Sequence, residues 1–123
     1  MAIRLPVGGQ AYQRPRIIAA LGELDVAQTQ TQRTRERLEV DLALAQSQLS
    51  QSLSQLQTQR ERSTLLSERA RLIDKSFRTG ETALPEMLRA LAAAAGAESA
   101  YARQQVNHQL AIARLEQALG LLP

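Results

Sequence analysis

Apolar residues recur at alternating steps of three and four along most of the chain, the spacing that places them on one face of a helix. The longest run of this pattern consists of Leu38, Leu42, Ala45, Leu49, Ser52, Leu56, Gln59, Ser63, Leu66, Ala70, Ile73 and Phe77. A run of this length in a single phase is typical of a coiled coil. It predicts a first helix over about residues 19–79.

A second run with the same spacing predicts a second helix over about residues 83–119. Its members are Leu84, Met87, Leu91, Ala94, Glu98, Tyr101, Gln105, His108, Ile112, Leu115, Leu119 and Leu122. Residues 92–97 are alanines with one glycine, so a neighbouring helix is expected to approach closely there. Gly120 fits the position just past the end of this helix, with Pro123 beyond it.

The residues between the two runs carry the signals of a helix end followed by a helix start. Gly80 suits the left-handed position after a helix, because it has no Cβ to clash at positive φ. Lys75 and Arg78 place positive charge near the carbonyl end of the first helix. Thr82 is a candidate cap for the second helix, and Pro85 is tolerated only in a first turn. The sequence therefore predicts an antiparallel coiled-coil hairpin.

Residues 1–16 differ from the rest, and we expect two regions: a strand stub with linker over 1–16 and the hairpin over 17–123. The segment from Ile3 to Val7 has the composition of a strand end, followed by Gly8-Gly9 as a break. Pro15 then suits the first turn of the first helix. A strand this short needs partners that the chain does not contain, so the chain looks incomplete by itself.

The surface of the first helix indicates more than one neighbour. Residues 42–59 contain no charged side chain. A second, weaker apolar stripe at Leu44, Leu65 and Leu72 lies beside the main one and favours two neighbouring helices over one. The first helix is also expected to be longer than the second, so part of its apolar face needs cover from elsewhere.

Composition narrows the choice of function. One Phe, two Tyr and no Trp among 123 residues argue against an ordinary globular core. The net charge of +3 comes mainly from arginine, but acids are interleaved with it, as in the i,i+4 pair Arg35 and Glu39. A nucleic-acid interface needs a clustered basic face with stacking aromatics, so no nucleic-acid partner is expected.

The chain offers no constellation for catalysis or metal binding. Cysteine is absent, and the single histidine, His108, occupies an apolar-face position where a packed polar role is the usual one. Gly8-Gly9 lacks the spacing and the lysine of a phosphate-binding loop. No signal peptide and no apolar run of membrane-spanning length are apparent. We therefore expect no enzyme activity, no cofactor and no metal.

At the turn the sequence resembles the TolC-type outer-membrane channels of tripartite efflux systems. The matching pattern is Phe77, two residues, Gly80, then Leu84 with Met87-Leu88, and a second helix that ends in residues 115–120, LEQALG. The form Gly80-Glu81, Leu84-Pro85, Leu88-Arg89 is most similar to the heavy-metal (cobalt–zinc–cadmium) branch. Residues 5–7 followed by Ala20 and Ala27 resemble the family's last barrel strand running into its long helix.

The resemblance implies a fragment of a longer protomer and a specific place in the cell envelope. It implies a homotrimer whose β-barrel crosses the outer membrane and continues into a periplasmic α-barrel, to which this hairpin would belong. The turn would dock a periplasmic adaptor (membrane fusion) protein, and through it an inner-membrane pump. The docking tip would comprise Arg78, Thr79, Gly80, Glu81, Thr82 and Ala83. Glu86 and Arg89 would lie at the channel entrance, where Arg89 replaces the second acid of the best-known members.

One alternative stays open at this stage. The same hairpin pattern fits a free-standing, soluble coiled-coil interaction module in which two hairpins cover each other. The upstream gene sequence separates the two interpretations, because a signal peptide and another strand–hairpin repeat there would favour the channel.

Overall fold

The computed structural model describes residues 7–121 of the chain, with side chains from Arg14 onward. These residues form two α-helices, α1 (Val7–Arg78) and α2 (Leu84–Ala118), joined by a short turn. The chain divides into two units, Met1–Val40 and Asp41–Pro123, which are treated separately below. Residues 7–121 contain no strand, so the expected all-α fold is confirmed for this part of the chain.

The first unit is described as a single stretch of α1 whose side chains are all exposed over residues 14–40. Large apolar residues share this exposure, among them Ile17 at 57%, Leu21 at 59% and Leu24 at 54%. No ion pair within 4.0 Å joins Arg35 to Glu39, although both are described. Since no side chain of residues 14–40 is buried, the stability of this stretch comes from local helical hydrogen bonds and helix propensity.

The start of α1 corrects the sequence-based expectation. α1 begins at Val7, so the expected strand is wrong at that residue, and the linker expected up to residue 16 is helical. Residues 3–6, which carried the rest of the expected strand, lie outside the described residues. A helix satisfies its hydrogen bonds within one segment, whereas a strand needs a paired strand, and residues 7–121 provide none. Pro15 consequently lies inside α1 instead of in its first turn.

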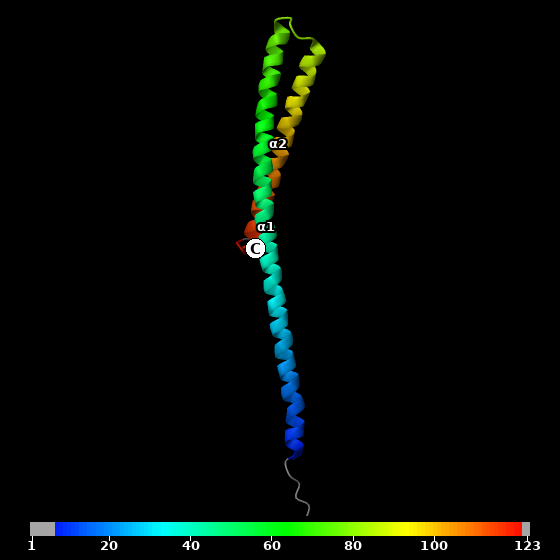
Figure 1. Ribbon diagram of the computed structural model, residues 1–123, viewed down its shortest axis with the longest axis vertical. Helices are drawn as coiled ribbons and strands as arrows, with labels where there is room; N and C mark the ends of the chain where they lie inside the picture. The colour runs from blue at the N-terminus through cyan, green and yellow to red at the C-terminus, as the bar shows by residue number, and fades with distance from the viewer. Residues whose placement is uncertain (1–6, 122–123) are drawn as a thin grey trace, which may run out of the picture. The chain divides into compact units, whose positions relative to one another are not determined.

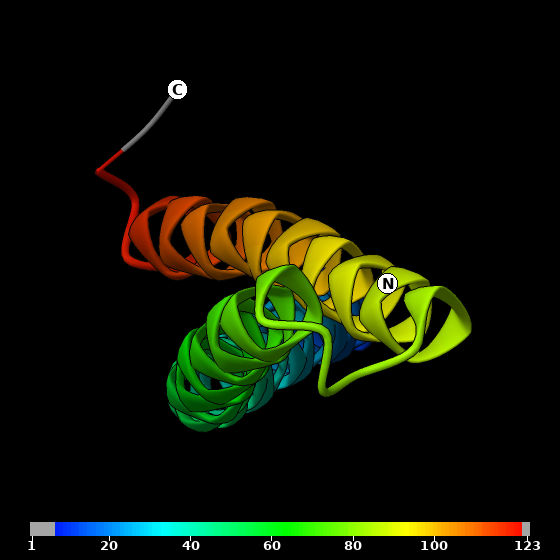
Figure 2. The same cartoon turned by 90° about the horizontal axis from the view of Figure 1, so that it is seen from above.

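The second unit is the antiparallel helical hairpin that the sequence predicted. The part of α1 from Asp41 onward lies beside α2, and the turn at one end connects them (Figure 1). Figure 2 shows the same two helices side by side when the unit is viewed from the turn. α2 is bounded by Leu84 and Ala118, within one residue of the expected 83 and 119.

The face that α1 turns toward α2 matches the prediction. From Leu42 to Phe77, every position of the predicted run is buried or half-buried. Only Leu38, the first member of the run and part of the first unit, is exposed, at 59%. The 3,4 spacing therefore identified both the helix and its rotational orientation for this half of the hairpin.

The face that α2 turns toward α1 was predicted only in part. The structure buries or half-buries an inner column at 3,4 spacing, namely Met87, Ala90, Ala94, Ala97, Tyr101, Gln104, His108, Ala111, Leu115 and Ala118. Alternate members of the predicted run belong to it, but Leu84, Leu91, Glu98, Gln105 and Leu119 are exposed instead. The prediction favoured the larger side chains, whereas the hairpin packs through the smaller ones.

The core of the hairpin is consequently narrow. The buried apolar residues among those described are Ala45, Ala70, Ala90, Ala94, Ala97 and Ala111. Ala70, Ala90 and Ala94 form one cluster against which Ile73 packs. Each buried methylene contributes about 0.8 kcal/mol, so alanines stabilise the pair of helices far less than leucines would. Most of the leucine surface of this unit stays outside the helix–helix contact.

Candidate functional site

The turn closes α1 with a Schellman motif around Gly80. Gly80 has φ of 80°, and its N–H donates to the carbonyl of Phe77 at 3.0 Å. The N–H of Glu81 donates to the carbonyl of Ser76 at 3.0 Å. These two bonds satisfy carbonyls that the helix end leaves free, and they require the left-handed conformation that glycine adopts most easily. The predicted role of Gly80 is therefore confirmed.

A side-chain hydrogen bond spans the turn where a helix cap was expected. The hydroxyls of Ser76 and Thr82 lie 2.6 Å apart, so Thr82 bonds back to α1 instead of capping α2. The residue before α2 is Ala83, which makes no side-chain capping bond. Pro85 lies in the first turn of α2, as predicted, and lacks the N–H that a cap would otherwise satisfy there. The prediction that Thr82 caps α2 is therefore wrong, and its bond to Ser76 stabilises the turn instead.

The six residues expected to form a docking tip lie together at this turn. Five of them are exposed, and Thr82 is half-buried. Arg78 forms an ion pair with Asp74 at 3.1 Å, the one ion pair among the described residues. The turn thus presents both signs of charge on a fixed backbone, with Glu81 following the glycine.

Glu86 and Arg89, the expected entrance residues, lie on one flank of the hairpin just past the turn. They line a groove of about 360 Å³ together with Arg69 of α1. Leu66, Ala90 and Ala93 complete its lining. Arg69 was not among the residues predicted to lie at this position. Arg69 directly precedes buried Ala70, and this neighbour is the sequence signal that would have located Arg69 beside the contact with α2.

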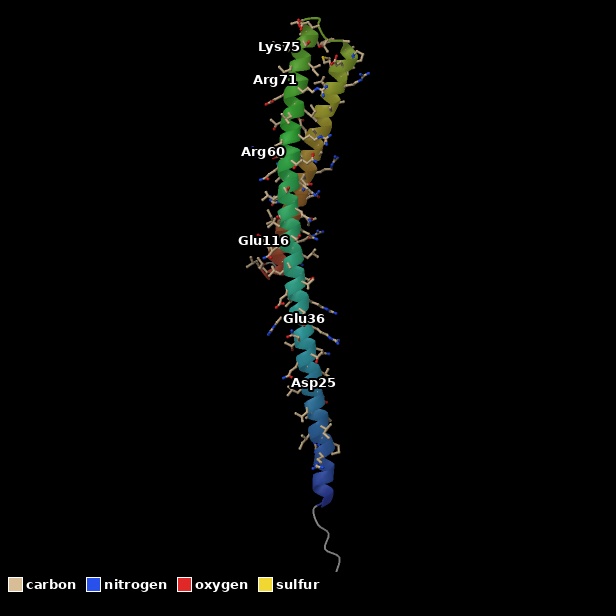
Figure 3. All side chains as sticks on the ribbon, viewed as in Figure 1. Asp25, Glu36, Arg60, Arg71, Lys75 and Glu116 are labelled. Atoms are coloured by element: carbon tan, nitrogen blue, oxygen red, sulfur yellow. The ribbon has the colours of Figure 1, made fainter. Side chains whose placement is uncertain are left out.

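Most other charged residues of the hairpin point into solvent. Arg60, Arg71 and Lys75 extend from α1 in this way (Figure 3). An exposed charge of this kind contributes little to stability and keeps the surface hydrated. The apolar residues that share the surface with them are therefore the more informative feature.

An outer column of leucines follows α1 on the groove side of the hairpin. Leu65 and Leu72 lie four residues before and three after groove residue Arg69, so the three are neighbours on the helix surface. Leu65 is 65% exposed and Leu72 is 64% exposed. Leu44 continues the same seven-residue spacing and is 55% exposed. These three residues are the second stripe that the sequence predicted.

The outer column of α2 lies on the opposite flank. It consists of Leu84, Leu91 and Leu119, which are 50%, 44% and 51% exposed. Glu98 continues this column, and it accepts a hydrogen bond from the Ser67 hydroxyl of α1 at 3.2 Å. That contact marks the flank away from the Arg69 groove, because Ser67 and Arg69 lie on either side of the buried face of α1. The hairpin therefore carries one leucine column on each flank.

A buried polar cluster joins the helices far from the turn. The Ser52 hydroxyl donates to the carbonyl of Leu49 at 2.8 Å and lies 2.9 Å from Nδ1 of His108. Because that hydroxyl has only one proton, Nδ1–H of His108 is the donor in the second bond. The Gln104 amide donates to the Ser52 carbonyl at 3.3 Å and to Oε1 of Gln55 at 3.2 Å. His108 thus has the packed polar role that the sequence favoured.

The described residues limit the chemistry that this surface supports. Within residues 7–121, no group of three His, Cys, Asp or Glu side chains is placed to hold a metal ion. Neither α1 nor α2, over its described residues, has an apolar stretch long enough to span a membrane. Comparison with protein-family models, with curated proteins and with solved structures gave no match.

Proposed function

We propose that this chain forms a helical hairpin in the periplasmic duct of a TolC-type outer-membrane channel, in the branch that exports heavy metals. In this role it performs no chemistry: substrate passes along the duct, and the turn at Gly80 docks an adaptor protein. The observation that carries the proposal is the pair of leucine columns on opposite flanks. A helical hairpin with one apolar edge suits a dimer, whereas two edges suit a row of hairpins that closes into a barrel.

The packing inside the hairpin supports the same proposal. The fully buried residues of the contact between α1 and α2 are alanine, serine and glutamine, so the leucines of the two outer columns remain for neighbouring helices. Exposed leucines on both flanks are unfavourable for an isolated chain and favourable where further helices cover them. In the proposed channel those neighbours come from the rest of the protomer and from two further protomers of a homotrimer.

The turn supports adaptor docking. Its backbone is fixed by the Schellman bonds and by the bond between Ser76 and Thr82, while Arg78, Thr79, Glu81 and Ala83 stay exposed. A fixed, exposed turn loses little conformational entropy when a partner binds it. The Arg69–Glu86–Arg89 groove lies next to the turn, where the proposed channel would narrow. There Arg89 would contact an acid of a neighbouring subunit and hold the entrance closed.

Deletion and complementation in the organism that carries the gene test this proposal. Loss of the gene should lower tolerance to cobalt, zinc or cadmium, and the wild-type gene should restore it. The double variant Leu65→Glu/Leu72→Glu should fail to restore tolerance, because it places charge in the outer column of α1. Gln57→Glu/Thr64→Glu is the matched control, since it adds the same two negative charges at exposed positions outside both columns. Unchanged metal tolerance after deletion would refute the proposed function.

The entrance hypothesis has its own measurement. Arg89→Ala should raise the leak through the channel reconstituted in a planar bilayer, because it removes the proposed closing contact. An unchanged conductance would count against a role of Arg89 at the entrance. Recovery of the chain in a soluble fraction as a pair of hairpins, with no envelope association, would favour the interaction-module alternative.

A further inference from the structure

α2 carries two alternative faces for packing on α1. The column Met87, Ala94, Tyr101, His108 and Leu115 belongs to both. On one side of it lie Ala90, Ala97, Gln104 and Ala111, which face α1 in the structure. On the other side lie Leu84, Leu91, Glu98, Gln105, Ile112 and Leu119, spaced by seven; all of them except half-buried Ile112 are exposed. Rotation of α2 about its own axis by roughly 50° would bring the second side against α1 in place of the first, given 3.6 residues per helical turn.

Burial of apolar surface alone favours the alternative rotational orientation of α2, which the structure does not adopt. Leu84 and Leu91 stay 50% and 44% exposed, whereas Ala90 and Ala97 are only 8% and 3% exposed. A leucine gains more from leaving water than an alanine does. The observed orientation of α2 also leaves one buried polar atom, Oε1 of Gln59, without a hydrogen-bond partner among the described residues. The Glu98 carboxylate opposes the alternative orientation, because it would have to leave water, and an attractive interaction between the helices can stabilise the observed one.

The polar cluster provides that interaction. Gln104 is 9% exposed and belongs only to the side that now faces α1. Its amide bonds to the Ser52 carbonyl and to Gln55, and both bonds break if α2 turns. Gln105 cannot replace it, because Gln105 would approach α1 from the side opposite Gln55. The bond between Ser52 and His108 lies in the shared column and brings the helices together at this level.

We propose that Gln104, together with Ser52, Gln55 and His108, sets the rotational position of α2 and thereby keeps its leucine column outward. Without this cluster, α2 turns and buries Leu84 and Leu91 against α1. The hairpin then covers its own apolar flank, and that flank is lost to any neighbour. The inference concerns the hairpin itself and holds whatever protein covers the flanks.

Thiol labelling of the full chain tests the proposal directly, because the chain contains no cysteine of its own. Leu91→Cys reports on the outer column, and Ala97→Cys reports on the inner column. Each is placed in the unaltered chain, in the cluster-free background Ser52→Ala/Gln104→Ala, and in the control background Ser63→Ala. Ser63 is a buried serine of the same face of α1 outside the cluster, so its replacement matches the serine change.

The ratio of the two labelling rates gives the result. In the unaltered and control backgrounds, Leu91→Cys should react faster than Ala97→Cys. In the cluster-free background the ratio should fall by about tenfold, since more than one hydrogen bond is lost. An unchanged ratio overturns the proposal. So does fast labelling at both sites, which would show that the cluster clamps the helices together without choosing between faces.

A second measurement avoids the added cysteines. Hydroxyl-radical footprinting of the cluster-free chain should show less oxidation of Leu84 and Leu91 than in the unaltered chain, with helical circular dichroism retained. Both experiments are run at two protein dilutions, so that protection by a second copy is recognised by its concentration dependence. Equal oxidation of the two leucines in both chains overturns the proposal independently.

Discussion

Replacing Gly80 by alanine should destabilise the hairpin, while the same replacement at Gly96 should stabilise it. A Cβ at either position meets no atom within 4 Å, so neither change creates a clash. Only the backbone differs: Gly80 has φ of 80°, whereas Gly96 lies within α2. The two variants therefore isolate the conformational requirement of the turn from every packing effect.

The magnitudes follow from the two backbone conformations. A left-handed conformation costs an alanine about 1–2 kcal/mol, offset in part by about 0.4–1 kcal/mol from the stiffer unfolded chain. Gly80→Ala should thus lower the free energy of unfolding by about 1 kcal/mol. Gly96→Ala should raise it by about 0.8–1 kcal/mol, because alanine is the better helix former. Gly80→Asn should fall between Gly80→Ala and the unaltered chain, since asparagine tolerates positive φ.

Urea unfolding followed by circular dichroism at 222 nm measures these differences. At matched protein concentration, each variant should move the midpoint by about 0.5 M in opposite directions, without a change in slope. The reasoning is refuted if Gly80→Ala is as stable as the unaltered chain, or if Gly96→Ala lowers stability. A change in slope would mean that the variant altered the structure and not only the turn.

Three further changes have defined outcomes. In a double-mutant cycle, Ser76→Ala and Thr82→Val should show a coupling of about 1 kcal/mol, the value of one hydrogen bond, and a coupling near zero would contradict a braced turn. Pro15→Ala should raise helical ellipticity and slow amide exchange near residue 15, since a proline inside a helix costs about 3 kcal/mol. Unchanged ellipticity would be inconsistent with α1 continuing through that residue. Asp74→Asn should change the free energy of unfolding by less than about 0.5 kcal/mol, because the side chain of its partner Arg78 is 76% exposed. A larger loss in unfolding measurements would argue against a solvent-screened pair.

The turn and the face of α1 followed from the sequence because their signals are local. Gly80 and Pro85 each have one conformation that fits their position, and both adopt it. Between Leu42 and Phe77 one run of 3,4 spacing is longer than any other on α1, so spacing alone determined which face of α1 meets α2. The second stripe of α1 was predicted for the same reason.

The orientation of α2 did not follow from the sequence, because two of its faces satisfy the same spacing. Side-chain size favoured the face with Leu91, and the structure uses the face with Ala97. Hydrogen bonds between the helices, such as that from Gln104 to Gln55, depend on which residues of α1 and α2 lie opposite each other. Thr82 shows the same limit, since its bond to Ser76 depends on the path of the turn.

The start of α1 was mispredicted for a different reason. Val7 and its neighbours resemble a strand end by composition, but a strand requires pairing that no described residue supplies. The six residues expected to form the docking tip do lie at the turn, while the position of Arg69 beside Glu86 and Arg89 was not predicted. Arg69 joins Glu86 and Arg89 only because the antiparallel packing brings its part of α1 beside them.

Oxidation of paired cysteines tests the central claim most directly, namely that α2 packs on α1 through its alanine column and leaves the leucines of its outer column outside. Ala70 and Ala90 belong to one buried cluster, whereas Leu91 is 44% exposed. Ala70→Cys/Ala90→Cys should therefore form a disulfide within one chain under mild oxidation, and Ala70→Cys/Leu91→Cys should not. A disulfide in the second pair and none in the first would contradict the account.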